Sequence, residues 1–236
     1  TDVPPEAQAG LIYEPKYDGM RVLVDLEPPA DRKAAPRVRI YSRNGHEKSA
    51  QFPAVTAALA KWAVTLDAPV LLDGELVAIS SKGVPLGFQH IQGRISLTGA
   101  AEIARAEKDQ PAAVIFFDIL RIGERDLRGE PLAARRLDLQ NLLKNDTRRR
   151  FSLIRLSEIA TDDGRAMLAR ARKEGWEGLI VKEGRSLYHS GRRTPAWRKL
   201  KLLAQQEFVI GGWTAPRQSR SHFGSILVGY RKGADL

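Results

Sequence analysis

The sequence predicts an α+β fold: antiparallel sheets flanked by helices, followed by the first strands of a second β domain. Short runs rich in β-branched residues, bounded by turn residues, lie between stretches whose apolar residues recur every three or four positions. After residue 203 the pattern of the sequence changes to short strand-like runs separated by glycine turns. We therefore expect a boundary near 203–206, with domains at 1–203 and 204–236. With 43 % apolar residues in 236, the chain can build a hydrophobic core.

The expected elements follow in chain order. Strands are expected at Leu11–Tyr17, Met20–Leu26, Arg37–Ser42, Val70–Ile79, Ala113–Leu120, Gly178–Lys182 and Glu207–Trp213. Amphipathic spacing predicts helices at Gln51–Val64, Leu132–Leu143 and Arg165–Glu174. The pair Asp18-Gly19 predicts a hairpin between the first two strands, in which Gly19 supplies a positive φ. Asp162 or Asp163 is expected to cap the last helix.

The charge of the chain predicts an anionic partner. Lys and Arg number 38 against 28 Asp and Glu, for a net charge of +10. Much of the excess positive charge lies in the segment from Lys182 to Lys201, which contains seven basic residues and one acidic residue. The absence of cysteine excludes disulfides and zinc-thiolate sites. No apolar window is long enough to span a membrane, and the first residues, from Thr1, do not form a signal peptide. We expect a piece of a longer, soluble cytoplasmic protein.

Lys16 is the candidate nucleophile. It stands at the end of the first expected strand, in Lys16-Tyr17-Asp18-Gly19, where an ordinary hairpin with a surface lysine is the alternative. A lysine amine acts as a nucleophile in covalent catalysis once it has lost its proton. A free lysine, with a pKa of ~10.4, is protonated at pH 7, but neighbouring cations lower that pKa and also offset phosphate charge. The cations expected around it are Arg21, Lys182, Lys199 and Lys201.

Five further motifs follow Lys16 in chain order: Ser42-Arg43-Asn44-Gly45, Leu72-Asp73-Gly74-Glu75-Leu76-Val77, Phe116-Phe117-Asp118-Ile119-Leu120, Glu177-Gly178-Leu179-Ile180-Val181-Lys182 and Trp197-Arg198-Lys199-Leu200-Lys201. Together they make 11–203 resemble the nucleotidyltransferase domain of ATP-dependent DNA ligases, an ATP-grasp-like fold whose superfamily includes RNA ligases and mRNA-capping enzymes. The residues of these motifs are most similar to those in the ligase module of bacterial end-joining ligase D. The tail from 206 resembles the opening of an OB-fold, truncated here.

The resemblance implies an activity and a set of ligands. Lys16 would take AMP from ATP, pass it to a DNA 5′-phosphate, and leave a 3′-hydroxyl to seal the nick. Glu75 and Glu177 would bind Mg²⁺ or Mn²⁺, and Glu75 would also reach the ribose. Because ligases of this type carry a further basic motif late in the OB-fold, which is outside this chain, we expect weak self-adenylation and poor sealing.

The resemblance also implies contacts to the base and to DNA. Phe117 would stack on adenine, with Ile180 and its strand closing the other face, unless Phe117 is a plain core aromatic. Glu14 and Tyr17 would read the adenine edge through their backbones. Nicked or broken double-stranded DNA would contact four polar side chains: Arg43, Asn44, Arg192 and Arg193. The alternative is that these side chains are merely solvated or cap a turn. Trp197 and Trp213 are expected to pack in the core.

Rival functions stay open at this point. An RNA ligase or a GTP-using capping enzyme would share the motifs, and a non-catalytic nucleic-acid-binding module would share the charge. A glycosidase built on the paired carboxylates is disfavoured, since a basic pocket keeps both acids ionised. By family, the parent protein would be a monomer in the bacterial cytoplasm, at the nucleoid. It would work with a Ku-like end-binding protein and fused or associated polymerase and nuclease domains.

Overall fold

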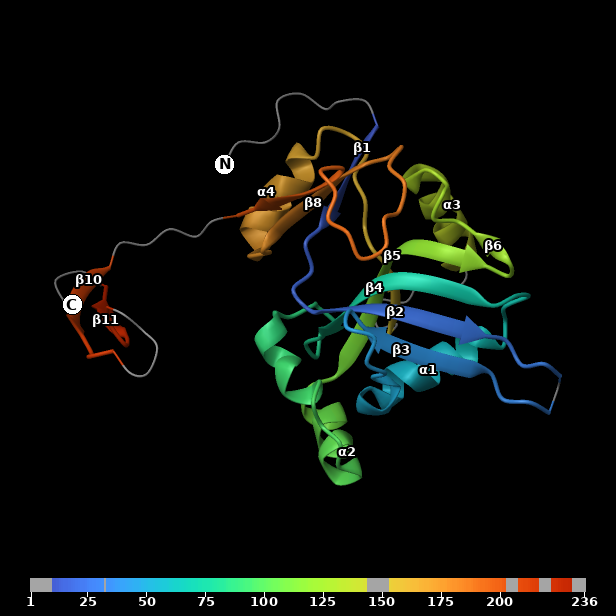
Figure 1. The fold of residues 1–236 in the computed structure, drawn as a ribbon, viewed down its shortest axis with the longest axis horizontal. Coiled ribbons are helices and arrows are strands. Elements are labelled where there is room, and N and C mark those ends of the chain that lie inside the picture. The colour runs from blue at the N-terminus through green and yellow to red at the C-terminus, as the bar shows by residue number, and fades with distance from the viewer. Residues whose placement is uncertain (1–9, 32, 144–152, 203–207, 217–221, 231–236) are drawn as a thin grey trace. The chain divides into compact units, whose positions relative to one another are not determined.

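The computed structural model describes residues 10–31, 33–143, 153–202, 208–216 and 222–230. It divides into two compact units, Thr1–Leu202 and Leu203–Leu236. The predicted boundary at 203–206 falls outside the described residues, so the domain limits stay a prediction. Figure 1 shows the first unit as two sheets with helices packed against them.

The larger sheet of the first unit has the order β3-β2-β4-β5-β6, and β7 joins it parallel to β5. Its strands are β2 (Met20–Glu27), β3 (Arg37–Ser42), β4 (Val70–Ala78), β5 (Ala112–Ile122), β6 (Arg125–Asp126) and β7 (Ile154–Leu156). Two helices, α1 (Pro53–Ala63) and α3 (Leu132–Leu143), contribute buried residues to one continuous core with this sheet. Burying that apolar surface is the main source of the unit's stability.

The smaller sheet has the order β1-β8-β9, all antiparallel. Its strands are β1 (Leu11–Pro15), β8 (Gly178–Glu183) and β9 (Trp197–Lys201), and helix α4 (Arg165–Glu174) packs on one face (Figure 1). That face forms a second hydrophobic cluster with α4. The other face of the sheet is therefore free to carry polar groups.

The predicted hairpin between the first two strands is wrong. β1 pairs with β8 in the smaller sheet, whereas β2 pairs with β3 and β4 in the larger one, so residues 16–19 cross between sheets. Gly19 is not among the positive-φ glycines of the chain. A Cβ built at Gly19 would lie 2.3 Å from the carbonyl oxygen of Leu76, so close backbone approach, not φ, requires glycine there.

The other predicted elements form with small shifts of their ends. The structure adds a helix that was not expected, α2 (Ala100–Asp109), and three short 3₁₀ helices, η1 (Ser49–Gln51), η2 (Phe88–His90) and η3 (Gln92–Arg94). Gly164 occupies the N-cap position of α4 without a side-chain cap. Asp162 and Asp163 nevertheless accept bonds from the amides of Gly164 and Arg165, at 2.8 and 3.0 Å.

The second unit contains an antiparallel pair, β10 (Val209–Trp213) and β11 (Ile226–Gly229). Trp213 is 75 % exposed, so the expectation that it packs in a core is wrong for the described residues. The identity of this unit as the start of an OB-fold stays a prediction. Among the described residues of the whole chain, no helix is both long and apolar enough to cross a membrane.

Candidate active site

The free face of the smaller sheet gathers five of the fifteen predicted site residues. Side chains alternate between the two faces of a strand, and the register places Glu14, Ile180 and Lys199 in one row across β1, β8 and β9. Lys182 and Trp197 share the next row. Alternation places Lys201 on the same face of β9. Motifs from three separate parts of the sequence thus meet on one surface.

Lys16 follows β1 at the edge of this face. Its backbone N–H donates to the carbonyl oxygen of Gly178 at 2.9 Å, and its Nζ donates to Oε2 of Glu177. Nζ of Lys201 lies 3.8 Å from the other carboxylate oxygen of Glu177. Only 13 % of the Lys16 side chain is exposed. The structure therefore brings the candidate nucleophile and a candidate metal ligand into direct contact.

The larger sheet presents carboxylates to the same region. Glu75 on β4 is paired in register with Arg21 on β2, and its Oε1 accepts a bond of 3.2 Å from the amide of Gly19. Burial raises the pKa of the Glu75 carboxyl to about 7. The bond from Gly19 lowers this pKa, whereas the negative charge of Asp73 raises it further. Arg21 donates to both carboxylate oxygens of Asp73, at 3.0 and 2.6 Å.

Phe117 lies at a β-bulge in β5, next to the core residue Phe116. Asp73 of β4 faces Asp118 and Gly74 faces Phe116, so Phe117 is the extra residue. Phe116 enters the core, whereas the ring of Phe117 lies 4.4 Å from Nζ of Lys182 and edge-on to Trp197, with centroids 6.3 Å apart. Phe117 therefore lies beside Lys182 and Trp197 and is not part of the hydrophobic core.

Lys182 has a buried counter-ion. Its Nζ donates to Oε2 of Glu14 at 2.8 Å, and it also lies 4.2 Å from the ring centroid of Trp197. Sequence reasoning considered only the backbone of Glu14 and missed this ion pair. Because Glu14 offsets Lys182 and Asp73 offsets Arg21, the predicted positive field around Lys16 is partly neutralised. Trp197 is half-buried on the site face, so its assignment to the core is wrong.

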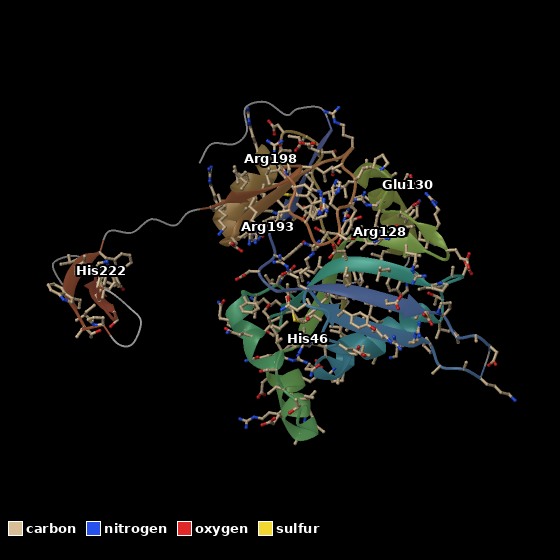
Figure 2. All side chains as sticks on the ribbon, viewed as in Figure 1. His46, Arg128, Glu130, Arg193, Arg198 and His222 are labelled. Atoms are coloured by element: carbon tan, nitrogen blue, oxygen red, sulfur yellow. The ribbon has the colours of Figure 1, made fainter. Side chains whose placement is uncertain are left out.

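The remaining predicted residues lie around this centre. Tyr17 packs against the cluster of Val77 and Ile115, and burial raises the pKa of its phenol to about 12. Lys199 is exposed on the site face. Arg43 and Asn44 are exposed in the turn after β3, closed by a bond from Gly45 to Ser42. Two more exposed cations, Arg192 and Arg193, lie in the loop between β8 and β9. Figure 2 labels Arg193.

Two further residues join the site without having been predicted. Asp73 is fully buried beneath Arg21, and its i,i+2 spacing from Glu75 on one strand is a signal that could have found it. Tyr188, in the loop between β8 and β9, donates its hydroxyl to Asp73 at 2.7 Å. Nothing in the sequence marks that contact, because the two residues are far apart along the chain.

The carboxylates fit a divalent cation. Mg²⁺ and Mn²⁺ prefer oxygen ligands and are commonly held by one or two carboxylates together with water and phosphate oxygens. Glu75 is partly buried and makes no ion pair within 4 Å among the described residues, so a cation there would supply the missing charge. Glu177 already contacts two lysines. No group of three or more acidic or imidazole ligands occurs in the described part of the chain, so other ligands would be substrate oxygens or water.

Comparisons with known proteins show which family the chain belongs to. The ATP dependent DNA ligase domain family matches residues 4–201. The multifunctional non-homologous end joining DNA repair protein LigD of Mycobacterium tuberculosis is 36 % identical over 218 residues, which are 92 % of this chain and 25 % of that protein. LigD of Pseudomonas aeruginosa is 37 % identical over 217 residues, or 92 % of this chain and 23 % of that protein. The chain thus spans about a quarter of these curated relatives.

Solved structures extend the likeness to three dimensions. The crystal structure of the ligase domain of M. tuberculosis LigD matches with a TM-score of 0.65 and 34 % identity, over 97 % of this chain and 65 % of that one. Mycobacterial DNA ligase D complexed with ATP and MES matches with a TM-score of 0.64 and 30 % identity, at the same coverage. The chain therefore belongs to the ATP-dependent DNA ligase domain family and has the nucleotidyltransferase fold of those ligases.

Proposed function

We propose that this chain is the adenylation domain of a DNA ligase, and that Lys16 forms a covalent lysyl-AMP. The observation that carries the proposal is the contact between the Lys16 amine and Glu177, whose other carboxylate oxygen lies 3.8 Å from Nζ of Lys201. A surface lysine with an incidental partner would not be only 13 % exposed while sharing that partner with a second lysine.

The chemistry needs a neutral amine held in line with a phosphate. Nζ of Lys16 would attack the α-phosphorus of ATP, so that an N–P bond forms, the bond from that phosphorus to the bridging oxygen breaks, and pyrophosphate leaves. Glu177 orients the amine through their hydrogen bond. Cations offset the phosphate charge around the attack: Arg21, Lys182, Lys199 and Lys201. A divalent ion held by Glu75 and Glu177 would neutralise charge on the phosphate oxygens.

The base would lie between the two sheets. Phe117 would stack on adenine from the larger sheet, and Ile180 would close the other face from the smaller one. Glu14 and Tyr17 would contact the edge of the base, and Glu75 the ribose. The support for this placement is the ring of Phe117, whose centroid lies 4.4 Å from Nζ of Lys182 on the smaller sheet.

The second and third steps would use DNA. The AMP would pass to a 5′-phosphate, and a 3′-hydroxyl would then displace it to seal a nick or break. Exposed polar side chains would hold the DNA backbone: Arg43, Asn44, Arg192 and Arg193. Because the curated relatives are named for non-homologous end joining, we place the chain in that repair process in the bacterial cytoplasm, at the nucleoid. It would act as a monomer alongside a Ku-like protein and polymerase and nuclease domains.

Covalent labelling tests the proposal. Wild-type chain incubated with Mg²⁺ and ATP labelled at the α-phosphate should acquire label, and Lys16→Ala should acquire none. Lys61→Ala, at an exposed position of α1, is the matched control and should label like wild type. Matching circular dichroism spectra would show that all three chains are folded.

Mass spectrometry of the purified chain completes the test. An unlabelled wild type that already carries the mass of one AMP would be a pre-adenylated preparation, and would support the proposal. An unlabelled, folded chain without that mass would favour the non-catalytic nucleic-acid-binding module. Label from GTP in preference to ATP would instead favour the capping-type enzyme.

A further inference from the structure

Tyr188 makes a hydroxyl contact that spans the two sheets of the first unit. Its Oη donates to Oδ2 of Asp73 at 2.7 Å and accepts from Nη2 of Arg21 at 3.3 Å. Asp73 is fully buried on β4, whereas Tyr188 belongs to the loop that joins β8 to β9. Three residues from separate parts of the chain therefore close one hydrogen-bonded ring.

The backbone and ring of Tyr188 are also held in place. Its N–H donates to the carbonyl oxygen of Arg128 at 3.0 Å, in the segment between β6 and α3 that Figure 2 marks by Arg128 and Glu130. Its ring packs edge-on to Trp197, with centroids 6.2 Å apart, and the guanidinium carbon of Arg135 lies 5.8 Å from the ring centroid. The hydroxyl is thus presented from a fixed position and is not a mobile surface group.

The network fixes the orientation of Arg21. Asp73 binds Nε and Nη2 of that guanidinium, Tyr188 accepts a second bond from Nη2, and Nη1 has no partner among the described residues. The guanidinium carbon lies 5.8 Å from the ring of Phe117 and 6.0 Å from that of Trp197. A guanidinium held on one edge presents its other N–H groups in a fixed direction, which suits an anionic ligand.

We propose that Tyr188 is a positioning residue, which holds Arg21 so that its free edge binds the phosphates of ATP. This inference rests on the proposed function of the site. It goes beyond that function by assigning a role to a loop tyrosine that does not contact the ligand itself and acts on it through Arg21. Without the hydroxyl, Asp73 still pairs with Arg21, but the guanidinium gains freedom to rotate, which weakens phosphate binding.

Binding of ATP alone tests the proposal, in the 236-residue chain carrying Lys16→Ala so that no covalent step intervenes. Calorimetric titration should show that Tyr188→Phe, which keeps the ring and removes the hydroxyl, weakens ATP binding about tenfold. Tyr41→Phe is the matched control, because its hydroxyl also accepts from an arginine, Arg39, at 3.3 Å on β3. It should change the affinity less than twofold.

A double-mutant cycle separates positioning from a general structural effect. In an Arg21→Ala background, Tyr188→Phe should have almost no further effect on ATP affinity, because the group it positions is gone. An undiminished loss in that background, or unchanged affinity in the single variant, would overturn the proposal. So would a complete absence of ATP binding by the Tyr188-intact chain.

The labelling experiment remains a separate readout. If ATP binds as expected but Lys16 never becomes labelled, the role of Tyr188 is upheld and the proposed covalent function is wrong. If Lys16 is labelled normally while the cycle shows no coupling between Tyr188 and Arg21, the proposed function stands and the role of Tyr188 is wrong.

Discussion

Lys182 and Glu14 form an ion pair of 2.8 Å whose side chains are only 2 % and 3 % exposed. They lie diagonally across β1 and β8, because Glu14 is in register with Ile180 and Lys182 with Ile12. The ammonium group also contacts the ring of Phe117 on the larger sheet. One buried pair thus ties both sheets together at the centre of the proposed nucleotide site.

Breaking that pair on one side should be costly. Lys182→Met leaves the carboxylate of Glu14 buried without a counter-charge, so the free energy of unfolding should fall by about 3–5 kcal/mol. The double variant Glu14→Gln/Lys182→Met should recover much of that loss, because no charge then remains buried. Urea unfolding of wild type, Lys182→Met, Glu14→Gln and the double variant measures this directly, and strictly additive losses would contradict the coupling.

The raised pKa of Glu75 predicts a pH-dependent stability difference. In the folded chain burial raises its pKa from the ordinary 4.5 to about 7, so the folded state favours the neutral carboxyl. The stability this proton provides is complete below pH 4.5 and is lost as the pH rises to 7. Glu75→Gln, which is neutral at every pH and can still accept the bond from Gly19, should therefore be more stable than wild type above pH 7.

Thermal unfolding of both chains from pH 5 to 9 checks this prediction. The advantage of Glu75→Gln should approach about 1–3 kcal/mol at pH 8 and shrink steadily toward pH 5. An advantage that is the same at pH 5 and pH 8 would show that the amide acts by packing and not through the charge of the carboxylate.

Most of the site could be predicted because local pattern and motif order carry it. Strand alternation aligns Ile180 with Lys182 on a strand that the sequence predicts, whereas the strand that carries Lys199 and Lys201 was not predicted. The pairing partner of a strand is not local, and the turn signal at Asp18-Gly19 could not reveal that β1 joins β8. The same holds for the bulge at Phe117, which no residue type marks.

Contacts between distant parts of the chain account for what was missed. The ion pair of Glu14 with Lys182 and the bond of Tyr188 with Asp73 join residues separated by more than a hundred positions. Each depends on how the two sheets pack, which composition and periodicity do not encode. The neutralised field around Lys16 is one consequence, since a count of charges does not show which of them are paired.

Gly178 should tolerate no side chain. It has a φ of +144°, and a Cβ there would lie 2.0 Å from the carbonyl oxygen of Leu200, within the pairing of β8 with β9. Gly178→Ala should therefore destabilise the chain by more than about 3 kcal/mol. Gly175→Ala is the control, with a φ of +70° but open space around the added Cβ, and should cost only about 1 kcal/mol. Equal losses in chemical unfolding would rule out the clash at β9.

The proposed DNA contacts predict a change in salt dependence. Each phosphate neutralised by a cation releases counter-ions, so the logarithm of the binding constant falls with the logarithm of salt by about 0.9 per contact. Arg43→Ala and the double variant Arg192→Ala/Arg193→Ala should reduce this slope by about one and two contacts, measured on nicked duplex DNA by fluorescence anisotropy. The basis is their exposed position and the absence of side-chain hydrogen bonds or ion pairs to other described residues.

Arg105→Ala provides the comparison for charge alone. Arg105 lies on α2 with 85 % of its side chain exposed and pairs with Asp109, so its removal changes the net charge as Arg43→Ala does. If the three arginines bind phosphates, only their variants should alter the slope, since a single distant charge acts through the screened general field. Equal slopes for Arg43→Ala and Arg105→Ala would place the DNA elsewhere on the first unit.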